Sequence, residues 1–380
     1  MSKTIIDLDI GVDDALALIY ALASSELDIL ALTPVFGNTT IEHVYKNLIK
    51  TFHVMERQLE TVEPTLRETR WPGLVRAQRQ KIQVSKEGAR LPIDGEFATA
   101  SYFHGPDGLS NISEIRPELI PPPSYFPASL ELSSKASSDL ILEVLEKEVA
   151  NTVTIVALGP LTNLALAHKA NPEIFTKVKQ VVWMGAALDV PGNTSPSAEF
   201  NLYADPYAGA YIFDASSPSR SSHPFHLTIL PLDVTTPHAV PFPELLLPSP
   251  ESPVDVYTSA FLPRVKEIYS SLGLPDEMEM HDPMVVWVAV ALARGDSGFS
   301  VRRRKFEVER KGEWTRGMCV IDRRGTEEAD LAIRTHGGIK PKSSDEIKSD
   351  VSQSGIEVVV ETTGKEAFRK EFMQRTFGRA

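Results

Sequence analysis

The sequence is poor in the features that mark several protein classes. It has one cysteine, Cys319, among 380 residues, which excludes an internal disulfide framework and a cysteine-based metal cluster. Lysine and arginine number 39 against 51 aspartates and glutamates, for a formal net charge of −12. That balance gives no sign of a basic surface for nucleic acid or for an anionic membrane. A small molecule is therefore the expected partner.

Long apolar runs are also missing. None reaches the roughly 18 to 20 residues that a membrane-spanning helix needs. In the opening MSKTIIDLD, acidic residues stand where the apolar part of a signal peptide would be. No GxGxxG motif follows the first predicted strand, which argues against a dinucleotide-binding dehydrogenase. We expect a cytoplasmic protein with neither a membrane nor a nucleic acid as its partner.

The sequence does contain a regular alternation of strand and helix patterns. Short β-branched runs alternate with longer segments of helical period, as in βα units. The predicted fold is α/β, with an open, mostly parallel, doubly wound (Rossmann-like) central sheet and helices on both faces. The predicted strands are 4–9, 29–36, 152–158, 180–184, 227–233 and 356–361, and the predicted helices are 13–23, 41–58, 138–150, 161–168 and 282–294.

Two regions break this alternation. Residues 60–136 and 235–255 are rich in proline, serine and charge, and we interpret them as long surface excursions over a single domain that spans residues 1–380. Within that domain, the segments 60–100 and 235–280 are assigned to surface excursions or active-site loops. We favour a tolerated insertion for 60–100, with a plausible strand at 81–84. Residues 340–354 are interpreted as a solvated linker.

Four aspartates crowd the N-terminal stretch IIDLDIGVDD: Asp7, Asp9, Asp13 and Asp14. In an open α/β sheet the ligand site lies beyond the carboxyl ends of the strands, and Asp9 stands at that edge. Capping the following helix needs only one or two carboxylates, and close like charges raise one another's pKa unless a cation lies among them. Oxygen ligands without a cysteine or a histidine pair indicate Ca²⁺ or Mg²⁺.

Further polar groups stand where other strands end or a helix begins. Because such ends meet at one edge of a parallel sheet, we expect these groups to converge on the aspartates. They are Gly37-Asn38, the GPLTN stretch at 159–163, Met184-Gly185, the AEFN stretch at 198–201 and His281-Asp282.

In their order, these motifs resemble the inosine-uridine preferring nucleoside hydrolase family, whose opening motif is DxDPGxDD. Here the motif is DLDIGVDD, with Ile10 in place of the usual proline. The resemblance spans nearly the whole chain. It continues through VFGNTT (35–40), FHGPDGL (103–109), VALGPLTNLALA (156–167), VVWMGAA (181–187), GNTSPSAEFN (192–201), DP (205–206), PLDVT (231–235), HDP (281–283) and GEWTRGMCVID (312–322).

The resemblance implies hydrolysis of the N-glycosidic bond of uridine-type or inosine-type ribonucleosides, giving ribose and a free base. It implies a Ca²⁺ ion held by the carboxylates of Asp9, Asp14 and Asp282 and by the main-chain carbonyl of Leu158. Asp9 would act as the general base, and Asp7 would lie just outside the ligands and orient them. A homodimer or homotetramer is also implied.

The same resemblance assigns the substrate contacts. Ribose hydroxyls would be held by side-chain amides and carboxylates, and the leaving base would be assisted by histidine. The two histidines favour the pyrimidine or inosine-uridine type over the purine-specific type. The matching residues are Asp13 and Asn38 for the 2′ and 3′ hydroxyls, Asn201 for the 3′ side, Asn193 and Glu199 for the 5′ hydroxyl, Met184 for the pocket wall, His281 for leaving-group activation and His104 as a second base-side histidine.

Two alternatives stay open at this point. A haloacid dehalogenase-like phosphohydrolase could hold Mg²⁺ at DLD with an aspartyl nucleophile, but this interpretation leaves the AEFN and HDP motifs unexplained. A catalytically silent nucleoside-binding protein would keep the pocket without turnover, and the presence of both Asp9 and His281 argues against it.

Overall fold

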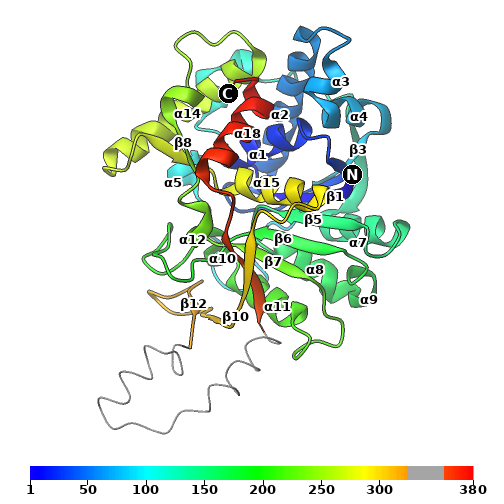
Figure 1. Cartoon of the computed structure of the whole chain (residues 1–380), viewed down its shortest axis with the longest axis vertical. Coiled ribbons are helices and arrows are strands. Elements are labelled where there is room, and N and C mark those ends of the chain that lie inside the picture. Colours follow the sequence, from blue (N-terminus) through cyan, green and yellow to red (C-terminus); the bar gives the residue numbers. More distant parts are fainter. Residues whose placement is uncertain (323–354, 380) are drawn as a thin grey trace.

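A nine-stranded sheet forms the centre of the molecule (Figure 1). The computed structural model describes residues 1–322 and 355–379. Within these residues the strand order is β10-β13-β7-β6-β5-β1-β2-β3-β4, and every neighbouring pair is parallel except β10 with β13. The predicted α/β class with a mostly parallel sheet is confirmed. The strands are β1 (Ser2–Leu8), β2 (Leu27–Pro34), β3 (Ile82–Glu87), β4 (Leu130–Ala136), β5 (Val153–Ala157), β6 (Gln180–Met184), β7 (Leu227–Leu230), β10 (Ser300–Arg304) and β13 (Ile356–Glu361).

The chain leaves the middle of this sheet in two directions. From β1 it proceeds outward through β2, β3 and β4, whereas β5, β6 and β7 follow one another on the other side of β1. The boundary between β1 and β5 is therefore the topological switch point, where open α/β sheets bind their ligands. The Leu158 N–H donates to the Asp7 carbonyl oxygen at 2.8 Å, so the ends of these two strands lie side by side.

Two hydrophobic clusters cover the two faces of the sheet. Along β1, Ile5 belongs to one cluster and Ile6 to the other, because successive side chains of a strand point to opposite faces. One group of helices packs on the Ile6 face of the sheet and a second group packs on the Ile5 face. In Figure 1 the first group lies in the upper part of the molecule and the second in the lower part. The first group includes α1 (Val12–Leu22), α2 (Ile41–Thr61), α14 (Pro253–Ser271), α15 (His281–Arg294) and α18 (Lys365–Phe377), and the second includes α7 (Ser137–Lys147), α8 (Thr162–Ala170) and α11 (Pro206–Ser216).

The strands and helices predicted from periodicity all overlap observed elements, with their ends shifted by a few residues. The linker predicted at 340–354 lies outside the described residues. Within 1–322 and 355–379, no helix combines the length and the apolar character that crossing a membrane requires.

The prediction of a surface excursion over 60–136 is wrong for much of that region. β3 and β4 complete one side of the central sheet, and Trp71, at the start of α4 (Pro72–Gln80), is fully buried. The segment 60–100 thus contributes buried residues to the fold, and the strand expected at 81–84 is present as β3. The favoured insertion relative to the family stays a prediction. The outermost strand β4 is mainly exposed beyond Leu130, so its sequence, LELSSKA, lacks the apolar pattern of an internal strand.

The surface excursion predicted at 235–280 also needs correction. This region contains β8 (Ala239–Pro241), α13 (Phe242–Leu245), α14 and β9 (Glu277–Glu279). Tyr257 and Phe261 of α14 are fully buried. The prolines that indicated a loop stand at the first turn of α14, as Pro253, and inside it, as Pro263. Pro253 is compatible with a helix because backbone N–H groups in the first turn have no partner within the helix, so the N–H that proline lacks is not missed.

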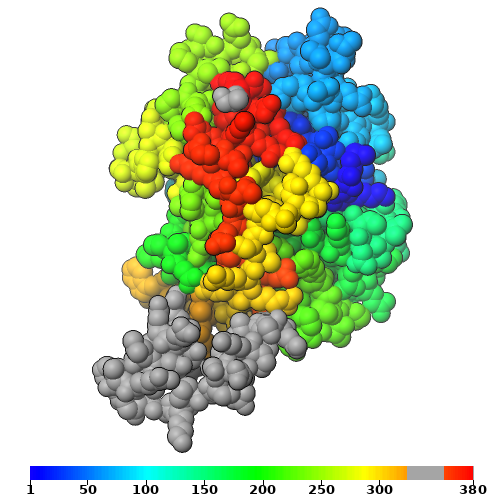
Figure 2. Space-filling view, viewed as in Figure 1, coloured from blue at the N-terminus to red at the C-terminus, as the bar shows by residue number. Residues whose placement is uncertain are grey.

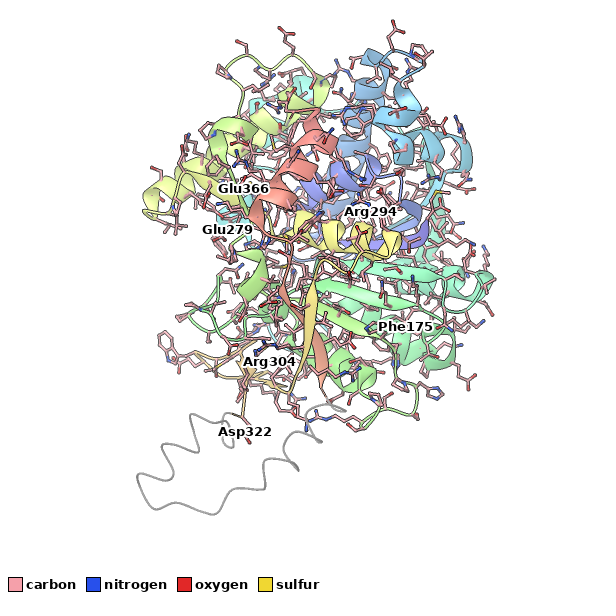
Figure 3. All side chains as sticks on the ribbon, in the orientation of Figure 1. Phe175, Glu279, Arg294, Arg304, Asp322 and Glu366 are labelled. Carbon is pink, nitrogen blue, oxygen red and sulfur yellow. The ribbon has the colours of Figure 1, made fainter. Side chains whose placement is uncertain are left out.

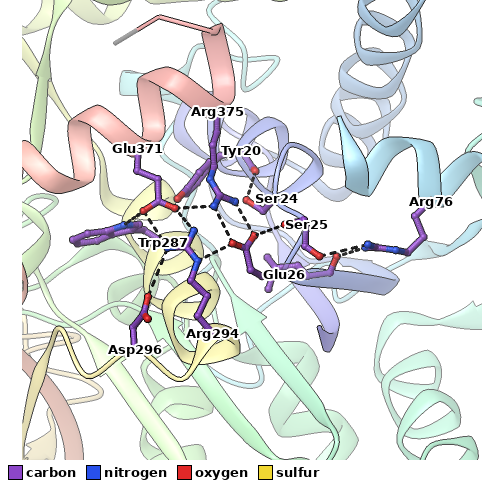
Figure 4. Close-up of polar contacts among 11 residues, drawn as sticks. Tyr20, Ser24, Ser25, Glu26, Arg76, Trp287, Arg294, Asp296, Glu371 and Arg375 are labelled. Atoms are coloured by element: carbon purple, nitrogen blue, oxygen red, sulfur yellow. Dashed lines mark hydrogen bonds and ion pairs between the residues drawn. The ribbon is translucent and has the colours of Figure 1, made fainter. Parts of the chain in front are cut away.

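Charged side chains join the C-terminal helix α18 to the start of the chain (Figure 4). Two Arg375 nitrogens donate to the Glu26 carboxylate at 2.7 and 2.9 Å, and Arg294 Nε donates to it at 2.7 Å. Both arginines also pair with Glu371. In the space-filling view, α18 (red) lies directly beside the α15 segment (yellow) (Figure 2). The cluster thus joins the residue before β2 to two helices, α15 and α18, on one face of the sheet.

Replacing Glu26 by glutamine should destabilise the fold by about 2 kcal/mol at pH 7, because both arginines lose a charged acceptor. Burial raises the pKa of Glu26, but the hydrogen bonds from Arg375 and Arg294 outweigh it and lower the pKa to about 2. The stabilisation is therefore complete above the ordinary value of 4.5 and is lost as the pH falls toward about 2. Urea unfolding of both proteins at pH 7 and pH 3 measures this difference, which should shrink at pH 3.

The exposed pair Arg79–Glu68 provides the control. Its side chains are 63% and 66% exposed, so Glu68→Gln should leave the unfolding midpoint unchanged. A Glu26→Gln protein as stable as the parent at pH 7 would contradict the prediction.

Candidate active site

A cavity of about 580 Å³ opens at the carboxyl edge of the central strands. It is walled by the loops after β1, β2, β5 and β6 and by the ends of α14 and α15. Ten of the residues predicted for the site are Asp13, Asn38, His104, Leu158, Met184, Asn193, Glu199, Asn201, His281 and Asp282, and all of them line the cavity.

The loop after β1 folds around the Asp14 carboxylate. The backbone N–H groups of Asp9 and Gly11 donate to it at 3.2 and 2.9 Å, and Asn38 Nδ2 donates to it at 2.8 Å. The Asn38 backbone N–H donates to Asp9 Oδ2 at 2.7 Å. Asn38 therefore holds the carboxylates of both Asp9 and Asp14, and it joins the loops after β1 and β2 at the site.

Two glycines leave room for the Asp9 carboxylate. A Cβ atom at Gly37 would lie 2.0 Å from Asp9 Oδ2, and one at Gly159 would lie 2.7 Å from Oδ1. Neither distance is compatible with a side chain. The backbones after β2 and β5 thus approach Asp9 from two sides, at a distance that only glycine permits.

Several aspartate carboxylates lie close together at the site, and some of their oxygens lack a hydrogen-bond donor. Oxygen atoms of Asp13, Asp14 and Asp282 lie within 4.8 Å of one another. Among the described residues, the buried oxygens Asp9 Oδ1 and Asp13 Oδ1 have no hydrogen-bond partner. Burial, followed by the charge of nearby carboxylates, raises the pKa of Asp9 and of Asp282 well above the ordinary value. An all-oxygen group of this kind fits a hard divalent cation, which would relieve both the repulsion and the missing donors.

The acidic cluster brings together residues with different predicted roles. Asp14 and Asp282 share it with Asp13, which was predicted to bind ribose. Asp9 lies close to this cluster, because the charges of Asp14 and Asp13 contribute to its raised pKa. The predicted ligand set stays a prediction.

On the opposite wall, Asn201 connects the ends of β5 and β6. Its Nδ2 donates to the Leu158 carbonyl oxygen at 2.7 Å and to the Met184 carbonyl oxygen at 3.1 Å. A carbonyl oxygen has two lone pairs, so Leu158 keeps one for another partner.

Glu199 is buried at the start of α10 (Phe200–Ala204), next to Asn201. Its carboxylate accepts from the backbone N–H groups of Asn201 at 2.7 Å and of Ala186 at 2.9 Å. Burial raises its pKa despite these bonds. Asn193 is held nearby, since its Oδ1 accepts from the Phe200 N–H at 3.0 Å. These polar groups are fixed before any ligand arrives.

The two histidines have different partners. His104 Nδ1 accepts from the Val12 N–H at 3.1 Å, so the neutral ring carries its proton on Nε2. Burial, and then the charge of His281, lowers the pKa of His104 to about 3. His281 Nδ1 lies 2.8 Å from Thr235 Oγ1 and its Nε2 lies 3.1 Å from Glu279 Oε2. Burial lowers the pKa of His281, but the surrounding carboxylates, led by Glu279, outweigh this effect and raise it.

Asp7 lies beneath the cavity and does not line it. Its Oδ1 accepts from Thr33 Oγ1 at 2.6 Å and from Asn163 Nδ2 at 2.8 Å. Burial raises its pKa to about 7, although both bonds oppose the change. Asp7 thus connects β1 with β2 and α8.

Sequence reasoning did not identify several cavity residues. Tyr102, Tyr269 and Glu279 line the cavity. The position of Glu279, two residues before His281 in MEMHDP, was the only available signal. Tyr257 of α14 does not line the cavity; it is fully buried and bonds to Thr51 Oγ1 at 3.1 Å, so its role is packing.

Comparison with known proteins decides the family. The model of the inosine-uridine preferring nucleoside hydrolase family matches residues 4–338. The chain belongs to this family. The hydrolase is 32% identical over 324 residues to the pyrimidine-specific ribonucleoside hydrolase RihA of Salmonella paratyphi C, covering 84% of this chain and 88% of the relative. It is 30% identical over 325 residues to an uncharacterized protein of Schizosaccharomyces pombe, covering 84% and 89%.

Solved structures agree with this assignment. A plant nucleoside hydrolase superposes on this hydrolase with a TM-score of 0.73 at 25% identity, covering 99% of this chain and 98% of that one. A purine-preferring ribonucleoside hydrolase from Gardnerella vaginalis gives 0.71 at 23% identity, covering 99% and 98%, and at that identity it supports the fold alone. The enzyme hydrolyses the N-glycosidic bond of ribonucleosides. The family overturns the phosphohydrolase alternative.

Proposed function

We propose that this hydrolase releases uracil or hypoxanthine from uridine-type and inosine-type ribonucleosides, with Ca²⁺ as its resident ion. The observation that supports it most directly is the cavity, which brings the acidic cluster, a set of buried amides and carboxylates, and two histidines into one space. The pyrimidine specificity of the RihA relative also favours uracil as a released base.

The carboxylates of Asp9, Asp14 and Asp282 and the carbonyl oxygen of Leu158 would hold the ion, and the unpartnered oxygens and oxygen-only chemistry of this group fit calcium. When bound, Ca²⁺ would lower the pKa of the attacking water. Asp9 takes the proton of that water as general base, through Oδ1, which has no donor among the described residues. Asp7, held by Thr33 and Asn163, orients the strand end that carries Asp9.

Ribose would be held by groups that are already fixed. Asp13 and Asn38 would take the 2′ and 3′ hydroxyls, Asn201 the 3′ side, and Asn193 with Glu199 the 5′ hydroxyl. Met184 would line the ribose pocket, where it is nearly fully buried. The negative charge of these walls also stabilises the positive charge that develops on the sugar in the transition state.

The base would lie toward the histidines. His281 assists the leaving base with a hydrogen bond or a proton, and the neutral His104 supplies an Nε2–H beside it. Tyr269 brings aromatic surface to this part of the cavity, since its hydroxyl accepts from the Glu279 N–H at 3.4 Å.

A panel of nucleosides tests the proposal. Uridine, cytidine, inosine, adenosine and nicotinamide riboside are incubated with the enzyme and Ca²⁺, and the released bases are separated by chromatography. Uridine and inosine should give the highest kcat/KM. 2′-Deoxyuridine should react at least about 10³-fold more slowly, because the missing hydroxyl leaves buried polar groups unpaired. Unchanged uridine and inosine after long incubation would instead support a silent binding protein.

The resemblance also leads us to propose a homodimer or homotetramer, and a single domain across residues 1–380. Light scattering on the purified protein measures the mass. A monomer at the micromolar concentrations of the assay would contradict the oligomer.

A further inference from the structure

Glu279 is a carboxylate on the cavity wall that the proposed mechanism has not used. Its Oε2 lies 3.1 Å from His281 Nε2, while the other ring nitrogen lies 2.8 Å from Thr235 Oγ1. Both nitrogens of the imidazole therefore have a partner, and these partners fix the ring from opposite sides. Glu279 and His281 both line the cavity, so this contact lies on the cavity wall.

The backbone explains why Glu279 points there. It ends the short strand β9, which pairs with β8 so that Glu279 lies opposite Ala239. Met280, the N-cap of α15, follows Glu279 directly, and His281 is the first residue of that helix. The two side chains therefore come from the end of one element and the start of the next. Figure 3 shows Glu279 beside the α14 side of the molecule, next to the start of α15. Three elements thus hold His281: its own helix, β9 and the α12 segment (Leu232–Thr235).

An ordinary surface ion pair is the alternative, and the surroundings do not fit it. The side chains of Glu279 and His281 are 29% and 14% exposed, and the exposed part of Glu279 faces the cavity. Among the described residues, Glu279 forms an ion pair with His281 and with no lysine or arginine. Glu277, two residues earlier, pairs with Lys365 instead.

We propose that Glu279 is a positioning residue for the hydrolysis, fixing the orientation of the His281 imidazole on the base side of the cavity. The inference rests on the proposed role of His281 in leaving-group activation. Glu279 acts through the ring and need not touch the substrate. Without it, the imidazole keeps one partner, Thr235, and gains rotational freedom, and a misplacement of about 1 Å can cost about 10²-fold in rate.

The test compares two substrates with different leaving groups. Uridine needs assistance to lose its base, whereas p-nitrophenyl riboside carries an activated leaving group. Glu279→Ala should lower kcat for uridine by about 10- to 100-fold, because the His281 imidazole is no longer held in place. KM should change by no more than about threefold. Activity with p-nitrophenyl riboside should fall by less than about threefold. Glu279→Asp should recover part of the loss, and Glu277→Gln, on the same strand, should have no effect on either substrate.

The His281→Ala variant separates the two ideas. Because Glu279 acts through His281, adding Glu279→Ala to His281→Ala should cause no further loss with uridine. If His281→Ala alone keeps its uridine activity, the proposed role of His281 fails, and this inference fails with it. If His281→Ala loses that activity but Glu279→Ala does not, or if Glu279→Ala loses both substrates equally, only the positioning role is overturned.

Discussion

Asp9→Asn should lower kcat for uridine by about 10³-fold or more, the effect expected when a general base is lost from a site that otherwise keeps its shape. Asparagine has nearly the same volume, and its side-chain oxygen can still accept the Asn38 N–H that now bonds to Asp9 Oδ2 at 2.7 Å. It cannot take a proton from water. Since Asp9 is proposed to contact the ion and the water but not the nucleoside, KM should change by no more than a few fold when Ca²⁺ is saturating. Steady-state release of uracil measures both constants.

A surface aspartate serves as the control for this substitution. Asp214 lies on α11 with a side chain 55% exposed and pairs with Arg220, so Asp214→Asn should leave kcat and KM unchanged. Circular dichroism should show the same fold for both variants. An Asp9→Asn enzyme within tenfold of the parent would show that another group acts as the base.

Removal of divalent cations should abolish turnover by a comparable factor, about 10³-fold, because several kcal/mol of transition-state stabilisation would be lost. Added Ca²⁺ should restore the activity. Mg²⁺ should restore it less well, since it demands a stricter octahedral geometry. Calcium should also raise the thermal midpoint, because the proposed ligands Asp9, Asp14 and Asp282 come together only in the folded protein and the ion relieves the repulsion among these acids.

A ligand variant sharpens this second prediction. Asp282→Asn removes one charge from the cluster, so the Ca²⁺ concentration needed for half-maximal activity should rise by at least about tenfold. Isothermal titration calorimetry should give the same increase in Kd. Full activity in a chelated, metal-free sample, verified by elemental analysis, would contradict the calcium proposal.

The predictable part of this protein is its interior. In β1, the continuous burial from Thr4 to Leu8 follows from the apolar run before Asp9, as expected of an internal parallel strand. The sheet edge then determines where the acidic loop must lie. The same reasoning brought Asn38, Met184 and His281 to that edge, although no two of them are close in sequence. Parallel topology alone makes such residues neighbours.

The errors occur where local composition conflicts with tertiary packing. Trp71 is fully buried within a region rich in charge and proline, and the exposed strand β4 carries no apolar alternation. Helix α14 was hidden by Pro253 and Pro263. Each of these elements is defined by what packs against it, and a single sequence does not contain that information.

At the site, residue types were easier to predict than their pairing. The sequence indicated His281, but its carboxylate partner Glu279 comes from a short strand of three residues with little pattern of its own. Asp13 was predicted as a ribose contact, and the structure also places it within the acidic cluster. Distances of a few ångströms between loops depend on turns that periodicity does not specify.

The close approach of Gly37 and Gly159 to Asp9 gives a criterion for classifying related sequences. Consider a related chain that keeps the acidic motif but carries a larger residue at the position of Gly37 or Gly159. In that chain, either the carboxylate equivalent to Asp9 or the loop that carries the larger residue must have moved. Such chains are the first place to look for family members that have abandoned hydrolysis. Those with both glycines intact are the better candidates for enzyme screening.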